Sequence, residues 1–171
     1  MNEVMQALLN RRSVRKFTDQ PVPREILEDL TQAALHAPSG MCKKTWKFTV
    51  ISDPAKIAVL ADVIGKELGR DGYDMYKPTA LIIPSNLADS PYGMEDDACA
   101  LENIFLAAYS YGVGSVWINQ IRTICDVPAV RSLLTGYGIP ENHVVYGMAA
   151  LGYPDGEAGP YKPGGEVAFV D

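Results

Sequence analysis

Four cationic side chains stand within six consecutive positions near the start of the sequence. They are Arg11, Arg12, Arg15 and Lys16, although the chain as a whole is acidic, with 15 Lys and Arg against 21 Asp and Glu. If this stretch is extended, Arg11, Ser13 and Arg15 point to the same side. Two guanidinium groups and a hydroxyl suit a phosphate monoester, because each Arg can donate two parallel hydrogen bonds to its oxygens. The alternative is a solvated basic turn at a helix end, and composition alone leaves it open.

Other patterns that carry chemistry are absent or weak. The sequence has no Gly-x-Gly-x-x-Gly after a strand, no Walker phosphate loop and no Gly-x-Ser-x-Gly elbow. His36 and His143 stand far apart without neighbouring ligands, so a structural role is expected for both. Three acids at positions 95–97 are expected to form the solvated first turn of a helix, where the helix dipole favours negative charge.

The composition is that of a globular protein, with 47% hydrophobic and 21% charged residues. No apolar run approaches the length of a membrane span, and no signal peptide is recognised. Cys42, Cys99 and Cys125 fit neither a disulfide framework nor a zinc site, which favours a reducing, cytoplasmic setting. The net charge of −6 argues against a nucleic-acid partner.

Helix and strand signals alternate along the chain. Apolar spacing, a Pro at a first helical position and Gly after a last one predict helices over residues 4–9, 23–37, 53–69, 95–111 and 126–134. Runs of β-branched and aromatic residues predict strands over residues 46–52, 80–86, 114–119 and 143–153. Within this pattern, Pro23 is expected to be the first residue of its helix and Asp126 to cap the last one. The alternation predicts a single layered domain over residues 1–171, of the α/β or α+β class.

The C-terminal tail is rich in Gly and Pro and ends in the strand-like sequence EVAFVD, residues 166–171. A strand at the end of a loose arm needs a sheet edge to pair with, and we expect that edge to belong to another subunit.

Three motifs together resemble the nitroreductase family of flavoproteins. They are RRSVRKF at 11–17, APSGMCKKTWKF at 37–48 and GVGSVWIN at 112–119, and the similarity extends over nearly the whole chain. The resemblance implies an α+β fold with three α/β/α layers, in which helices flank a central, mostly antiparallel sheet. It also implies a homodimer in which the C-terminal arms are exchanged and FMN lies between the subunits.

The resemblance assigns the FMN-binding residues in three groups. Arg11 and Ser13 would hold the phosphate with Arg12 alongside, and Arg15 would reach the polar edge of the flavin ring, where a cation stabilises the charge of reduced flavin. The partner subunit would cover the ring with its second motif, and the third motif would lie along the other face, offering a backbone amide to N5. A late basic residue of the tail would lie near the phosphate. The residues that would cover the ring are Pro38, Ser39 and Gly40. Those along the other face are Trp117, Ile118, Asn119 and Gln120, and the late basic residue is Lys162.

The second motif departs from the usual pattern of the family at three positions. Cys42 stands beside the flavin where Asn is usual, Lys44 replaces Gln, and Thr45 replaces Pro. Lys44 would add charge that retunes the flavin or meets an acidic substrate, unless it is simply an exposed lysine. The chain also lacks a long insertion that shapes the substrate pocket of larger nitroreductases. Aromatic and apolar residues of two short loops are therefore candidates to line an open site: Tyr73, Tyr76, Tyr92 and Met94.

The resemblance predicts an FMN-dependent oxidoreductase that passes hydride from NADH or NADPH to a nitroaromatic, a quinone or another flavin. The absence of an acid–base pair fits, because the flavin carries the chemistry. Three alternatives stay open: a substrate-specific flavin dehydrogenase or dehalogenase, a flavin-delivery protein with little turnover, and a protein that holds another phosphorylated ligand.

Overall fold

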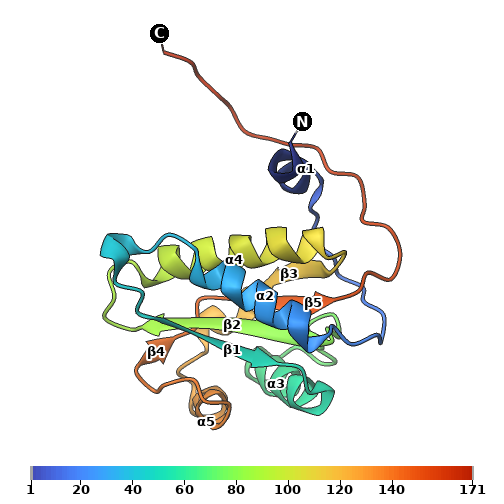
Figure 1. Ribbon diagram of the computed structural model, residues 1–171. Helices are drawn as coiled ribbons and strands as arrows, with labels where there is room; N and C mark the ends of the chain where they lie inside the picture. The colour runs from blue at the N-terminus through green and yellow to red at the C-terminus, as the bar shows by residue number, and fades with distance from the viewer. Residues whose placement is uncertain (1, 171) are drawn as a thin grey trace.

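The computed structural model describes residues 2–170. A short helix and an extended segment precede a layered body, and an irregular tail follows it (Figure 1). The order of elements is α1 (Glu3–Asn10), α2 (Arg24–Leu35), η1 (Gly40–Cys42), β1 (Trp46–Ile51), α3 (Pro54–Glu67), β2 (Ala80–Leu87), α4 (Gly93–Ser110), β3 (Gly114–Ile118), η2 (Gln120–Thr123), α5 (Pro128–Gly136), β4 (His143–Val144) and β5 (Met148–Gly152). Within residues 2–170, no helix has both the length and the apolarity to cross a membrane.

The sheet is antiparallel throughout its described strands, in the order β1-β2-β5-β3, and β4 pairs with one end of β2. Helices α2 and α4 cover one face, and α3 and α5 cover the other (Figure 1). The α+β, three-layer arrangement predicted for the sequence is therefore confirmed.

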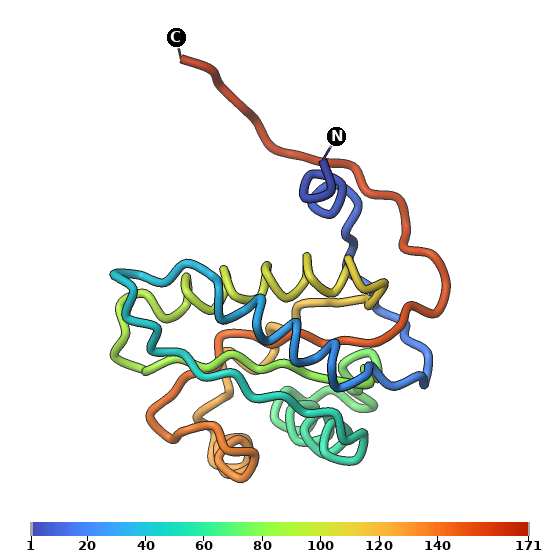
Figure 2. The backbone as a smooth tube through the Cα atoms, in the orientation of Figure 1, coloured from blue at the N-terminus to red at the C-terminus, as the bar shows by residue number. Residues whose placement is uncertain are grey.

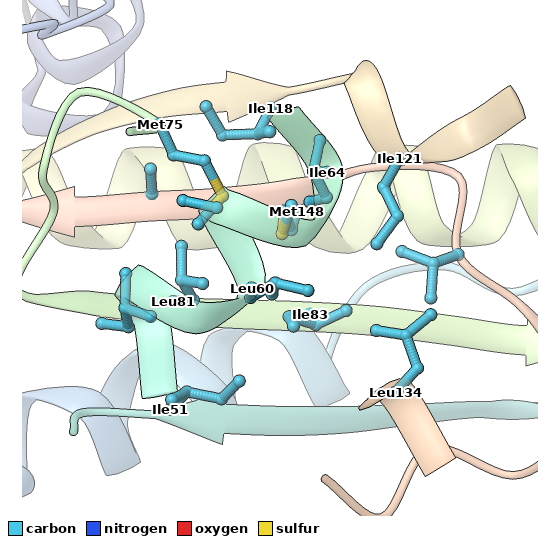
Figure 3. Close-up of a cluster of buried hydrophobic side chains, with 14 of the residues drawn as sticks. Ile51, Leu60, Ile64, Met75, Leu81, Ile83, Ile118, Ile121, Leu134 and Met148 are labelled. Carbon is cyan, nitrogen blue, oxygen red and sulfur yellow. The ribbon is translucent and has the colours of Figure 1, made fainter. Parts of the chain in front are cut away.

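Strand β2 shows how the sequence builds two cores around one sheet. Successive side chains of a strand point to opposite faces. Leu81 and Ile83 accordingly join the cluster beneath α3 and α5, whereas Ala80 and Ile82 join the cluster beneath α2 and α4. Figure 3 shows the first cluster, in which Leu60 of α3 faces Leu81 and Ile83. Because both faces are covered, β2 is apolar along most of its length.

Helix ends follow the local signals with small differences. Asp53 caps α3 by accepting a hydrogen bond from the Ala55 N–H at 2.9 Å, as the sequence predicts. Pro23 is the N-cap of α2, so the helix begins at Arg24, one position later than predicted. The cap predicted at Asp126 is wrong: Val127 is the N-cap of α5, and the Asp126 carboxylate instead pairs with Arg131 at 2.5 Å.

The single strand predicted over residues 143–153 is also wrong, because the chain there forms two short strands, β4 and β5. Between them, Gly147 lies against the indole ring of Trp117. A Cβ atom at Gly147 would approach Trp117 Nε1 to 2.3 Å, so only glycine fits there. An interior glycine that interrupts a strand often marks such a close approach.

Two segments of the chain expose apolar side chains to solvent. Helix α1 buries none of its residues, although it carries Val4, Met5, Leu8 and Leu9. The tail runs past the N-terminal helix and away from the body (Figure 2), and the described part of EVAFVD forms no strand within the chain. Its final residue, Asp171, lies outside the described residues. Val167, Phe169 and Val170 are more than four-fifths exposed.

Candidate functional site

The basic segment after α1 is extended and is held by the sheet. Val14 N–H donates to the Ser115 carbonyl at 2.9 Å, and Thr18 N–H donates to Tyr153 at 2.9 Å. Gly114 allows the close approach, because a Cβ there would lie 2.9 Å from the Val14 side chain. The backbone of the segment is thus fixed to β3 and to the chain just past the end of β5.

This extended segment brings Arg11, Ser13 and Arg15 to one cavity, as their spacing predicted. The cavity has a volume of about 410 Å³, and part of the tail closes it. Its lining residues are Leu8, Arg11, Arg12, Ser13, Arg15, Gly159, Pro160 and Tyr161.

Arg11 is held in an unusual environment for a guanidinium group. Its Nε atom lies 3.9 Å from Glu102 Oε1 of α4, and its guanidinium carbon lies 6.0 Å from the centroid of the Phe105 ring. The Nε–H group is buried and has no hydrogen-bond acceptor among residues 2–170. Leaving a buried donor unpaired costs about 1–3 kcal/mol, and more when the donor is charged. The Glu102 carboxylate, although beyond hydrogen-bond distance, balances part of the Arg11 charge.

Arg12 lines the same cavity but has a different task. Its Nη1 atom donates to the carbonyls of Leu9 and Arg11 at 2.8 and 2.7 Å, which satisfies the C-terminal end of α1. The guanidinium also stacks on the Tyr161 ring, 4.7 Å from its centroid. Tyr161 was not predicted from the sequence, because only the folded tail brings it back to α1. Lys162 is exposed and does not line the cavity.

The second motif lies at another part of the fold, at the N-terminal end of α4. Ser39 Oγ donates to Asp96 Oδ2 at 3.0 Å, and Gly40 N–H donates to Asp96 Oδ1 at 2.7 Å. Pro38 and Cys42 are exposed, and so is Lys44.

The solvated acidic turn predicted at positions 95–97 is therefore wrong for two of its three residues. Asp96 is 4% exposed and Asp97 is 0% exposed, whereas Glu95 faces solvent. Asp96 accepts the two hydrogen bonds from the second motif, and Asp97 Oδ1 accepts from Asn86 Nδ2 at 3.0 Å. Burial, partly offset by this hydrogen bond and increased by the Asp96 charge, raises the pKa of Asp97 to about 7.

The third motif approaches the first through an aromatic contact that the sequence did not reveal. The rings of Trp117 and Phe105 have centroids 6.2 Å apart, so Phe105 lies near both Trp117 and the Arg11 guanidinium. Trp117 remains 38% exposed, but the Ile118 side chain is 1% exposed and belongs to the core. Only the backbone of Ile118 is therefore suited to a ligand.

Asn119 and Gln120 line a smaller cavity of about 260 Å³ together with Arg70 and Arg122. The Asn119 N–H donates to Gln120 Oε1 at 3.1 Å, so the Gln120 side chain partly covers the backbone at the end of β3.

The residues predicted to line a substrate pocket do not lie at the Arg11 cavity. Tyr73 lines a cavity of about 830 Å³ between α3 and the loop that follows it, and burial raises its pKa to about 12. Tyr76 is exposed on that loop. The side chain of Tyr92 packs against Gly40, where a Cβ atom would approach it to 2.4 Å. Met94 is 40% exposed in the first turn of α4.

One chain alone does not assemble the three motifs. The Arg11 cavity contains no residue of the second motif. The two motifs contact α4 at Asp96 and at Glu102 to Phe105, which are about 9 to 14 Å apart along the helix at 1.5 Å per residue.

Comparison with known proteins decides the family. The sequence model of the nitroreductase family matches residues 8–153. The chain belongs to the nitroreductase family. Its fold agrees with that of a Bacteroides fragilis nitroreductase solved with bound FMN, at 36% sequence identity and a TM-score of 0.90, with 100% of both chains covered.

Curated relatives of this chain carry related names. A protein of Archaeoglobus fulgidus with the provisional name NADH dehydrogenase/NAD(P)H nitroreductase is 33% identical over 95% of this chain and 91% of its own. The NADPH-flavin oxidoreductase of Vibrio harveyi is 31% identical over 91% of this chain and 67% of its own.

Proposed function

We propose that this member of the nitroreductase family is an FMN-dependent oxidoreductase that passes hydride from NADH or NADPH to an acceptor such as a nitroaromatic or a quinone. The observation that carries the proposal is the cavity that Arg11, Ser13 and Arg15 line together. FMN-bound relatives support the choice of anion.

The residues of the cavity fit the phosphate of FMN. Three arginines, Arg11, Arg12 and Arg15, line it together with Ser13 and Tyr161, in a chain whose net charge is −6. Arg11 and Ser13 would bind the phosphate, because Arg matches phosphate oxygens with paired donors. Arg12 would hold the end of α1 in place, and Tyr161 would fix the Arg12 guanidinium. Lys162 follows Tyr161 and would approach the phosphate only if the tail moves or a partner subunit supplies it.

The remaining groups would orient the flavin ring rather than move protons. When bound, FMN would supply the hydride chemistry, accepting hydride from the nicotinamide and passing it to the acceptor. Arg15 would place positive charge at the polar edge of the ring, where negative charge develops. The exposed face of Trp117 and the backbone from Ile118 to Gln120 would border the ring, and the Trp117 side chain is held in place by contacts with Phe105 and Gly147.

We propose a homodimer in which FMN lies between the subunits and the C-terminal arms are exchanged. Two observations support it: α1 exposes an apolar face, and the tail carries exposed apolar residues with no cover. The partner subunit's Pro38, Ser39 and Gly40 would then cover the ring, which explains why one chain keeps this motif away from its own Arg11 cavity. The free thiols of Cys42, Cys99 and Cys125 are consistent with a reducing, cytoplasmic setting.

The proposal is tested by turnover of the protein loaded with FMN. Menadione and nitrofurazone serve as acceptors, and NADH and NADPH as reductants. Acceptor-dependent oxidation of either nucleotide, with parallel double-reciprocal plots, is the expected result for a flavin that is reduced and reoxidised in turn. Stoichiometric flavin binding without turnover would contradict the proposal and favour a flavin-delivery protein.

The Arg11→Ala variant tests the phosphate site directly. We expect it to lose FMN during gel filtration, because the substitution removes a charge-assisted donor worth about 1.5–3 kcal/mol per hydrogen bond. Arg24→Ala is the matched control, since Arg24 is an exposed arginine that pairs within α2, with Glu28 at 2.8 Å. Full flavin occupancy in Arg11→Ala would refute the phosphate assignment.

A further inference from the structure

The loop between α2 and β1 has an unusual backbone. Met41, Cys42 and Lys44 all have positive φ angles, of 53°, 54° and 49°, although none is glycine. L-residues rarely adopt this left-handed conformation, because it brings Cβ too close to the following carbonyl oxygen. Such strain persists where surrounding contacts over-determine it, and it is concentrated at functional sites.

The N-terminal side of this loop is tied to α4 by Asp96. Both carboxylate oxygens are used: Oδ2 accepts from the Ser39 hydroxyl at 3.0 Å, and Oδ1 accepts from the Gly40 N–H at 2.7 Å. The Ser39 oxygen in turn accepts from the Lys44 N–H at 2.9 Å. The hydroxyl therefore bridges the loop, and its single proton is committed to Asp96.

The C-terminal side of the loop is tied, through Asn86, to Asp97 of α4. Thr45 Oγ1 donates to Asn86 Oδ1 at 2.6 Å, and Asn86 Nδ2 donates to Asp97 Oδ1 at 3.0 Å. Asn86 also pairs with Trp46 across β1 and β2, so it cannot move freely. Two adjacent acids of α4 thus hold the two ends of one strained loop.

We infer that Asp96 is a positioning residue for the flavin: through Ser39 and Gly40 it fixes the shape of the loop that covers the flavin ring of the partner subunit. The inference rests on the proposed function. In this account the Ser39 hydroxyl shapes the loop and does not donate to the flavin, and Cys42 faces the ring only while Asp96 holds the turn.

The buried position of Asp96 explains why an acid is needed. A carboxylate offers two acceptors and no donor, and both are satisfied here by the hydroxyl and the amide. An asparagine in its place keeps the shape and one acceptor, whereas an alanine removes both ties. The series Asp96→Asn and Asp96→Ala therefore separates the size of the side chain from its hydrogen bonds.

The first experiment reads the shape of the loop without flavin. In a Cys99→Ser background, Cys42 is the exposed thiol, since Cys125 is buried. The rate at which DTNB labels Cys42 in the flavin-free dimer is compared for the parent, Asp96→Ala, Asp96→Asn and Glu95→Ala. Glu95 is the matched control, because it precedes Asp96 in the helix but faces solvent. We expect Asp96→Ala to change the rate several-fold, Asp96→Asn to change it less, and Glu95→Ala to leave it unchanged.

The second experiment measures the affinity for FMN and the midpoint potential of the bound flavin. We expect Asp96→Ala to weaken FMN binding by about tenfold, because binding must then order a loop that Asp96 no longer holds, and to shift the midpoint potential of the bound flavin. Asp96→Asn should recover part of both effects. A role confined to folding would lower the melting temperature without moving the potential.

The two experiments distinguish the possible failures. An unchanged Cys42 labelling rate in Asp96→Ala overturns the inference. A changed rate with unchanged FMN affinity and potential overturns its flavin part and leaves Asp96 as a structural residue. If the parent protein binds no FMN at all, the proposed function fails, and a role in positioning flavin fails with it, whatever the labelling shows.

Discussion

Asp97 should make the stability of the flavin-free protein depend on pH near neutrality. The carboxyl is fully buried, and its Oδ2 atom has no hydrogen-bond partner among residues 2–170. Burial raises its pKa from 3.8 to about 7, and the hydrogen bond from Asn86 lowers it by less than burial raises it. The charge of Asp96 contributes to this rise, and Tyr146 also lies within electrostatic range. The folded protein therefore binds a proton that the unfolded chain releases at lower pH.

The sign and size of the effect follow from this difference. Because the folded-state pKa lies above the unfolded-state value, the stabilising contribution is complete below the unfolded pKa and is lost as the pH rises through about 7. Raising a carboxyl pKa from 3.8 to about 7 corresponds to at most about 4 kcal/mol over the whole range. Between about pH 6 and about pH 9 the expected loss is about 1.4 kcal/mol.

Urea denaturation of the parent and Asp97→Asn at these two pH values measures the effect. Asparagine keeps the acceptor for Asn86 but cannot ionise, so the parent should lose about 1.4 kcal/mol more than the variant between the two conditions. Other groups cancel in this comparison, including His143, whose pKa is lowered by burial. Glu95→Gln is the control and should behave like the parent. Equal pH dependence of the parent and Asp97→Asn would refute the assignment.

Two further changes test the packing and the assembly. Gly147→Ala should destabilise the protein by about 1–3 kcal/mol, because the new Cβ would meet the Trp117 indole, and the denaturation midpoint would show it; an unchanged midpoint would mean that the indole can move aside. Deleting the tail after Pro160 should weaken both the dimer and flavin retention, since it removes the exposed apolar residues near the C-terminus and Tyr161, which stacks on Arg12. A dimer of undiminished stability with full flavin, measured by sedimentation and absorbance, would contradict the exchanged arm.

The features that the sequence predicted correctly are those set by neighbouring residues. The start of α3 follows from the Asp-Pro pair at Asp53, and strand β2 follows from its run of apolar residues. The convergence of Arg11, Ser13 and Arg15 required only an extended backbone, which the bond from Val14 to Ser115 provides.

The features that the sequence did not predict depend on contacts between distant segments. Three acids in a first turn are usually solvated, but here the loop after α2 folds over Asp96 and removes it from water. The break between β4 and β5 depends on the Trp117 ring, which arrives from another strand. Phe105 and Tyr161 belong to none of the three motifs. The packing of α4 brings Phe105 to Arg11, and the path of the tail brings Tyr161 to Arg12.

The central claim is that the protein holds an FMN that NADH or NADPH reduces. The most direct test is the visible spectrum of the purified protein after incubation with FMN and removal of the excess, recorded again after either nucleotide is added without oxygen. Our account predicts bound oxidised flavin whose visible bands bleach on addition of the nucleotide. A colourless protein would contradict the FMN site at Arg11, Ser13 and Arg15, and a bound flavin that stays oxidised with both nucleotides would contradict the proposed reaction.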